Sequence, residues 1–227
     1  MVMVAMHRVV KMLRKGKQMV SKKCGILFIL LILLGGCINM KNPAPKTDYY
    51  TFEYPPPKNT YAITMPYVLK IERFEVSPIY DDDRLQYRPE AFKRNVFSHH
   101  RWRTNPGNLV AVHLTRDFTH ASFLRAVITT ESIPTYTHFL TGTVEAFYQR
   151  VENNQWHAIL SVIVLLVDET AGPADSKILF QRRYSFQEAI SVKTPVGFVG
   201  GMSRAMQHIS STLIEDVFNT LTDSTES

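Results

Sequence analysis

The chain has 227 residues, a formal net charge of +6 and two cysteines, Cys24 and Cys37. Seven of its 26 Lys and Arg residues lie within residues 1–36, which hold no Asp or Glu, so residues 37–227 carry 19 basic against 20 acidic side chains. A body with this balance lacks the basic footprint of a nucleic-acid-binding protein. Because no cysteine follows Cys37, the body also lacks a thiol nucleophile, a disulfide and a thiolate zinc site.

The segment from Gly25 to Cys37 predicts a secretory signal. Nine apolar residues, 26–34, follow Lys22 and Lys23 and end at two glycines and Cys37. A basic flank, a short apolar core and small residues before a cleavage point are typical of such signals. The run is shorter than the roughly 20 apolar residues that a membrane-spanning helix needs. The alternative is an uncleaved anchor, or a buried helix with a chance cysteine.

The last four residues of this segment, Leu34-Gly35-Gly36-Cys37, resemble the lipobox of bacterial lipoproteins. The resemblance implies cleavage before Cys37, a thioether-linked diacylglycerol on its sulfur, and acylation of the new amino group by a fatty acid such as palmitate. Several acyl chains on one residue meet the two-signal requirement for stable anchoring.

Residues 1–36 are therefore expected to be a signal peptide, and residues 37–46 a lipidated tether with two prolines. Residues 1–18 are long and rich in methionine for the start of a signal, and Met19 is an alternative start that gives a more compact one.

One α+β domain is expected over residues 47–222, with a frayed tail over 223–227. Its first residues form an arm that ends in three consecutive prolines, 55–57, which forbid a helix. Four aromatic residues of the arm are expected to pack on the domain: Tyr49, Tyr50, Phe52 and Tyr54.

A strand is then predicted over 61–76 and a shorter one over 85–88, separated by an acidic turn at 81–83. The sequence Thr104-Asn105-Pro106 predicts a helix start, with a polar cap followed by proline in the first turn. This helix is expected to end near Phe118.

Alternating apolar residues predict strands over 123–128, 139–151, 155–167 and 178–186, with a hairpin turn at 152–154. Apolar residues on both sides of the strand over 155–167 favour a central strand with both faces covered.

After Gly200-Gly201, a helical repeat of apolar residues from Met202 to Leu221 predicts a long amphipathic helix. The predicted fold is α+β: a mainly antiparallel sheet with two principal helices packed on one face.

For each candidate catalytic or metal-binding residue, a structural role is favoured. Ser203 lacks the surroundings of a nucleophile elbow and is expected to cap a helix. The glycine-rich stretch 197–201 lacks the Lys and Ser or Thr of a phosphate loop, so a simple turn is expected. The acidic turn 81–83 lacks the spacing of a calcium loop. His99-His100 are neighbours on opposite faces of an extended chain, which disfavours a shared metal ion. The chain is therefore predicted to be no enzyme and to hold no metal or cofactor.

Arg101-Trp102 precedes the first predicted helix and has two interpretations. The pair closes the core by stacking, or it forms part of a contact surface, since Trp and Arg are enriched where binding energy concentrates.

Together these pieces resemble the auxiliary lipoproteins of ABC-type transport systems, the PqiC-like group. The resemblance covers nearly all of residues 47–221. The matching features, in chain order, are the lipobox at Cys37, Tyr49-Tyr50, a first strand around 69–74, Leu85-Gln86-Tyr87-Arg88, Arg101-Trp102 before the helix that contains 109–114, and the C-terminal amphipathic helix.

The resemblance implies a non-enzymatic component of a lipid-transport machine in the bacterial envelope. Such proteins work beside MCE-domain proteins and an ABC permease and ATPase, and the anchored domain would dock the conduit as a homo-oligomer. Ile38 after the cysteine favours the outer membrane, facing the periplasm, by the usual sorting pattern. The alternative function is a monomeric lipoprotein that binds a lipid or another small ligand directly.

Overall fold

The computed structural model describes residues 45–58, 61–129 and 135–226. Residues Lys46–Ser227 form one compact unit. The predicted signal peptide, nearly all of the predicted tether, and Cys37 lie outside the described residues. Among the helices of the described residues, none combines the length and the hydrophobicity that a membrane crossing requires.

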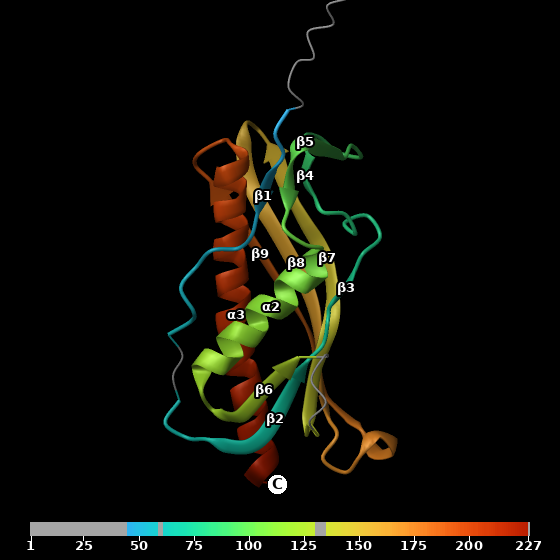
Figure 1. The fold of residues 1–227 in the computed structure, drawn as a ribbon, viewed down its shortest axis with the longest axis vertical. Helices are drawn as coiled ribbons and strands as arrows, with labels where there is room; N and C mark the ends of the chain where they lie inside the picture. The colour runs from blue at the N-terminus through green and yellow to red at the C-terminus, as the bar shows by residue number, and fades with distance from the viewer. Residues whose placement is uncertain (1–44, 59–60, 130–134, 227) are drawn as a thin grey trace, which may run out of the picture. The chain divides into compact units, whose positions relative to one another are not determined.

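The described unit is α+β, as predicted, with two α-helices on one face of a twisted sheet (Figure 1). The helices are α2 (Pro106–Ala121) and α3 (Pro195–Glu226), and a short 3-10 helix covers Pro173–Asp175. The strands are β1 (Asp48–Tyr50), β2 (Met65–Ile71), β3 (Glu75–Val76), β4 (Arg84–Arg88), β5 (Asn95–Trp102), β6 (Leu124–Thr129), β7 (His138–Glu152), β8 (Gln155–Asp168) and β9 (Lys177–Ile190).

The three longest strands form an antiparallel meander, β7–β8–β9, that carries most of the paired residues of the sheet. The predicted hairpin turn is confirmed, because Asn153 and Asn154 both have positive φ, 48° and 60°. Two successive residues with positive φ match the twist of an antiparallel hairpin, and Asn tolerates this conformation. The meander is thus fixed by its own local sequence.

Shorter parallel ladders were not foreseen. Strands β2, β3 and β4 follow one another along the free edge of β7, and all three run parallel to it. The single strand predicted over 61–76 is therefore wrong: the chain leaves the sheet between Glu72 and Phe74 and returns as β3. The break admits α2, whose Gly107 lies so close to the carbonyl of Phe74 that a Cβ there would sit 2.0 Å from the oxygen.

Strand β5 was also missed, because Asn95–Trp102 reads NVFSHHRW and shows little alternation. Its backbone is held from both sides, by an antiparallel ladder with β4 and a parallel ladder with β1. Tertiary pairing here outweighs a weak local preference.

Helix α3 starts seven residues before the predicted Met202, so the turn expected at 197–201 is wrong. The Thr194 hydroxyl accepts a hydrogen bond of 3.1 Å from the backbone N–H of Gly197, and Pro195 occupies the first helical position. Threonine followed by proline predicts a helix start, but the glycines at 197, 200 and 201 favoured a turn at this point of the sequence. Gly201 serves close packing instead, since a Cβ there would lie 2.9 Å from Cβ of Ala158 on β8.

The core lies between the helices and the inner face of the sheet. On β8, Ala158, Leu160 and Val162 are fully buried beneath the helices. The outer face of the same strand carries Ile159 and Ile163, which are only half-buried. The expectation that both faces of this strand are covered is therefore wrong for the described residues, because both α-helices pack on one side (Figure 1).

Candidate functional site

The predicted lipidation site, Cys37, lies outside the described residues and stays a prediction. The described chain enters the domain through β1, which pairs in parallel with the second half of β5. This places the start of the domain beside the last two residues of β5, Arg101 and Trp102, which are the predicted partner contact.

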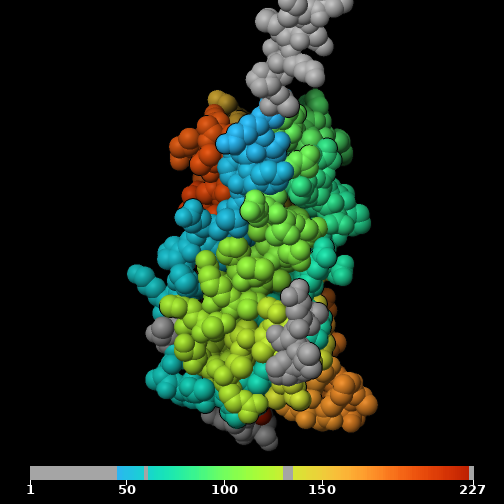
Figure 2. All heavy atoms as spheres, viewed as in Figure 1, coloured from blue at the N-terminus to red at the C-terminus, as the bar shows by residue number. Residues whose placement is uncertain are grey.

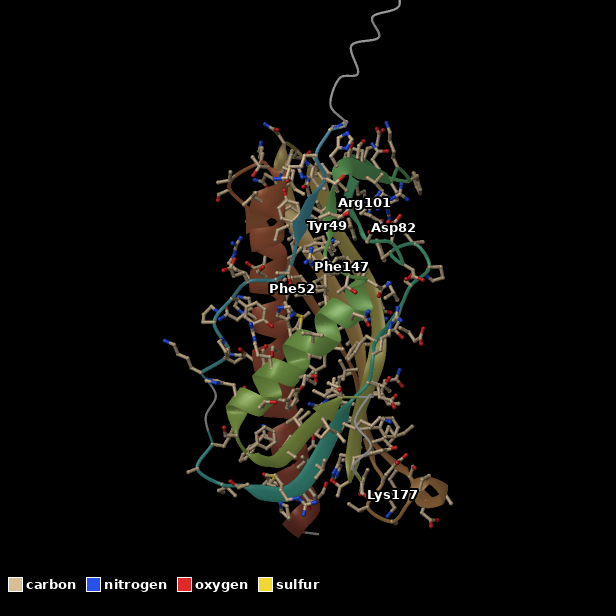
Figure 3. The ribbon with its side chains drawn as sticks, in the orientation of Figure 1. Tyr49, Phe52, Asp82, Arg101, Phe147 and Lys177 are labelled. Carbon is tan, nitrogen blue, oxygen red and sulfur yellow. The ribbon has the colours of Figure 1, made fainter. Side chains whose placement is uncertain are left out.

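Trp102 belongs to the core. Its side chain is 1% exposed and packs edge-on against Phe52 and Phe147, with ring centroids 5.6 and 5.0 Å away. Phe52 comes from the arm and Phe147 from β7, and Figure 3 labels both. This geometry supports the core-closing interpretation of the Arg-Trp pair, because the indole presents no surface to a partner.

Arg101 points the other way, since neighbours on a strand face opposite sides. Its Nη1 lies 2.6 Å from Oδ1 of Asp83, and about one third of its side chain is exposed. The Trp102 backbone N–H also donates to the Asp83 carbonyl at 2.6 Å. The predicted contact with a partner therefore concerns Arg101, together with Asp83, and it stays a prediction.

Each of the three carboxylates of the acidic turn 81–83 binds a polar or basic side chain. Asp81 bonds the side chain of Asn105, the residue that caps α2 by accepting from the N–H of Gly107 at 2.8 Å. Asp82 accepts from Nε of Arg84 at 2.8 Å, and this bond lowers the pKa of the Asp82 carboxyl to about 2. The turn thus ties β4, β5 and the start of α2 to one another.

A buried polar network clamps the arm onto α2. The Tyr54 hydroxyl donates to Oδ2 of Asp117 at 2.8 Å, and Arg116 donates from Nε to Oδ1 at 2.8 Å. The Arg116 guanidinium also lies over the Tyr54 ring, 4.3 Å from its centroid. Burial, followed by the negative charge of Asp117, raises the pKa of the Tyr54 hydroxyl. The network was missed because an Asp and an Arg inside a helical pattern read as ordinary surface residues.

Helix α3 holds the arm from the other side, and this explains Ser203. Its hydroxyl accepts a hydrogen bond of 3.0 Å from the backbone N–H of Glu53 and donates to the Val199 carbonyl at 2.9 Å. Gln207 donates to the Pro55 carbonyl at 3.2 Å. Ser203 is therefore an arm contact in the interior of the helix, and the expectation that it caps the helix is wrong.

The histidines are scattered over the described unit. His138 on β7 is buried, which lowers its pKa, and its Nε2 lies 3.8 Å from Asp168. His208 on α3 lies 3.6 Å from Glu188. Within residues 45–58, 61–129 and 135–226, no three His, Cys, Asp or Glu side chains gather as metal ligands would.

Among the described residues, the surface hollows include two that are large enough for a small ligand. One, of about 370 Å³, lies between α2 and the ends of β2 and β6, and Ile71, Ala111 and Val112 supply apolar lining. The other, of about 410 Å³, lies between the β4–β5 connection and the β7–β8 turn, and its lining includes Arg88, Arg150, Glu90 and Glu152. Both volumes fall at the lower end of the range of small-molecule sites.

Comparison with known families gives one match over most of the chain. The family described as "ABC-type transport auxiliary lipoprotein component" matches residues 50–213. The match runs from the last residue of β1 to the middle of α3 and so includes α2, strands β2 to β9 and the first part of α3. No curated protein matches the chain.

Solved structures share the fold. A crystal structure of protein XCC0632 from Xanthomonas campestris, assigned to the family model DUF330, has a TM-score of 0.69 at 14% identity and covers 79% of this chain and 100% of its own. A crystal structure of an uncharacterized protein has a TM-score of 0.61 at 11% identity and covers 76% of this chain and 99% of its own. At these identities the likeness concerns the fold alone.

Proposed function

Because the chain belongs to the family of ABC-type transport auxiliary lipoprotein components, we propose that it docks an ABC lipid-transport system to a membrane of the bacterial envelope. In this proposal Cys37 carries the acyl chains, the domain faces the periplasm, and the partners are an MCE-domain protein with its permease and ATPase. The observation that carries the proposal is the family match over residues 50–213.

The described side chains support docking over turnover. The hydroxyl and carboxylates that a catalytic interpretation would use are engaged in fold contacts: Ser203 with Glu53, Asp82 with Arg84, and Asp83 with Arg101. A general base or nucleophile has to reach a substrate, whereas these groups fasten one element of the domain to another. The proposed role is therefore that of a rigid adaptor on a lipid anchor.

The membrane assignment rests on the sequence around the cysteine. The residue after Cys37 is Ile38, which favours the outer membrane by the usual sorting pattern, as the resemblance implies. Self-association of identical domains is part of the proposal, because a docking platform for a conduit needs several contact points around it.

Direct ligand binding is the second candidate, and the hollow between α2 and β2 is the observation that favours it. Its volume of about 370 Å³ and its apolar lining by Ile71, Ala111 and Val112 suit one small apolar group. In this alternative the anchored protein is a monomer that holds the ligand itself.

Native mass spectrometry of the full-length protein, purified from membranes in mild detergent, separates the two candidates. Docking predicts a discrete oligomer whose mass is accounted for by acylated chains alone. Direct binding predicts a monomer with an additional bound lipid that is lost when Val112, which is 61% exposed at the hollow, is changed to Glu. A monomer without bound lipid contradicts both.

A further inference from the structure

Four segments distant in sequence meet at one end of the domain, which we name the β1 end: residues 45–49, 88–94, 150–155 and 190–196. The register of the strands places them together, since Arg88 of β4 pairs with Arg150 of β7, and Trp156 of β8 pairs with Ile190 of β9. Lys193 donates a hydrogen bond of 3.0 Å to Oδ1 of Asn154 and so links two of these segments directly. Figures 1 and 2 show this end at the top, with the blue start of the domain between orange and green residues.

Three of these segments display apolar side chains to solvent. Phe92, in the β4–β5 connection, is 103% exposed and has a φ of 63°, a conformation uncommon for a bulky residue. Val192 and Val196 flank the start of α3 and are 60% and 66% exposed, and Tyr49 is 56% exposed. A fully exposed Phe held in a left-handed turn has no packing role within the domain, and several exposed apolar residues at one end of a molecule indicate a contact surface.

Basic side chains surround these apolar residues. The four segments hold six basic residues and three acidic ones, Asp48, Glu90 and Glu152. The basic residues are Lys46, Arg88, Lys93, Arg94, Arg150 and Lys193. Among the described residues, Lys93 pairs with Glu90 and Arg150 with Glu152, whereas the other four basic side chains have no carboxylate within ion-pair distance. The β1 end therefore carries a net positive charge.

The opposite end of the meander has the reverse charge. Residues 168–177, which join β8 to β9, hold three acidic residues and one basic residue. The 14 residues of β8 separate the two ends by about 45 Å. The domain is thus polarised along its strands, with the positive and apolar end where the chain enters.

The chain outside the described residues limits where this end can lie. Seven residues lie between Cys37 and Pro45, so the eight Cα–Cα steps that join the two span at most about 28 Å when fully extended. A domain tethered this closely by acyl chains on Cys37 holds its β1 end within reach of the membrane surface. The following step rests on that proposed anchor.

We propose that the β1 end rests on the anionic headgroups of the anchoring membrane, with Phe92 inserted at the interface and Arg94 and Lys193 on lipid phosphates. Aromatic rings with an apolar body favour the headgroup boundary. Each Lys or Arg at an anionic surface strengthens adsorption, and long basic side chains extend to the phosphates beside a buried ring. The acidic β8–β9 connection then faces away from the bilayer, where the partners of the docking domain lie.

Tryptophan quenching in vesicles tests the orientation. Acylated full-length protein carrying Phe92→Trp is reconstituted into phosphatidylcholine and phosphatidylglycerol vesicles with bromine on the acyl chains, which quench a Trp that reaches them. The matched control is Ile178→Trp, an apolar residue 66% exposed at the far end of β9. Wild type, with Trp102 and Trp156, gives the baseline.

The expected result is that the Trp at position 92 loses most of its added emission in brominated vesicles, while the Trp at position 178 stays at its value in unbrominated vesicles. Lys193→Glu in the Phe92→Trp background shifts the insertion equilibrium toward the free state by roughly five-fold or more, because a lysine at an anionic surface is replaced by a repelled carboxylate. Acylation is measured by mass on the same sample.

Equal emission at position 92 with and without bromine, in protein shown to be acylated, overturns the inference and leaves the docking function standing. It also results if Phe92 meets a protein partner instead of lipid. Equal quenching at positions 92 and 178 overturns it as well, since the domain then has no fixed orientation. A protein without acyl chains removes the anchor of the proposed function and, with it, the basis of this inference.

Discussion

Tyr54 and Asp117 join the arm to helix α2 through a hydrogen bond of 2.8 Å from the phenol to a carboxylate that is 1% exposed. A buried charge is costly unless it is fully paired, and Arg116 supplies the second partner. The arm is thus part of the folded domain, bonded to α2 at Asp117 and to α3 at Ser203.

Removing the Tyr54 hydroxyl should destabilise the domain. Tyr54→Phe leaves one oxygen of the buried Asp117 without its donor, and we expect a loss of about 2 kcal/mol in the free energy of unfolding, typical of a hydrogen bond to a charged group. Chemical denaturation measures it. Tyr49→Phe, at a ring 56% exposed, is the matched control and should change nothing. Equal stability of both variants would show that the network does not hold the arm.

Two glycines in helices should respond to alanine in opposite directions. At Gly107 a Cβ would sit 2.0 Å from the Phe74 carbonyl oxygen, so Gly107→Ala has to displace α2 from the sheet and should cost several kcal/mol, on the order of other severe overpacking changes. At Gly200 a Cβ would meet only Nη1 of Arg204, at an ordinary contact distance of 3.8 Å, and Gly200→Ala should stabilise by about 1 kcal/mol through helix propensity. Thermal unfolding of the two variants checks both signs, and a neutral Gly107→Ala would contradict the close contact.

The Asp82–Arg84 pair should make the free energy of unfolding depend on pH in the acid range. The pKa of Asp82 is lowered to about 2 in the fold, so its contribution is present above the unfolded pKa near 4 and is lost as pH falls from about 4 to about 2. Asp82→Asn should abolish this contribution to the loss of stability in acid. The contribution is at most about 2 kcal/mol, because the Asp82 side chain is one quarter exposed and its charge is partly screened.

Denaturant midpoints measured from about pH 5 to about pH 2 check the Asp82 prediction. Asp175→Asn, at an exposed carboxylate in the β8–β9 connection, is the control. Parallel pH profiles of wild type and Asp82→Asn would rule out the proposed contribution of the pair.

Arg101 and Trp102 should separate into a contact residue and a core residue. Trp102→Ala removes a side chain that is 1% exposed among Phe52 and Phe147, and should cost about 4 kcal/mol of folding free energy. Arg101→Ala breaks a partly exposed ion pair and should cost less than about 1 kcal/mol.

Partner recovery is the second readout for Arg101. If Arg101 contacts a partner, Arg101→Ala lowers co-isolation of that partner from membranes although the domain stays folded. Unchanged recovery would assign Arg101 a purely structural role beside Asp83.

The meander and the first helix could be predicted because their signals are local. Alternation over residues 139–167, the turn Asn153-Asn154 and the start Asn105-Pro106 each report a backbone state within a few residues. The fold class followed from the order of these elements.

The missing parts depend on contacts between distant residues. Strand β5 is formed by pairing with β4 and β1, and its own sequence alternates weakly. The glycines at 197–201 read as a turn, whereas Gly201 lets α3 approach Ala158 on another element. The Tyr54–Asp117 hydrogen bond joins residues 63 positions apart, and the local sequence around either residue does not predict the other.

The central claim is that this lipid-anchored domain serves an ABC transport system, and co-isolation from membranes tests it most directly. Full-length protein is extracted in mild detergent, and the bound proteins are identified by quantitative mass spectrometry, with Cys37→Ala as the unanchored control. The claim predicts that an ABC permease or ATPase, together with an MCE-domain protein, is enriched with the acylated protein and lost with Cys37→Ala. Acylated protein recovered without any transport component would contradict it.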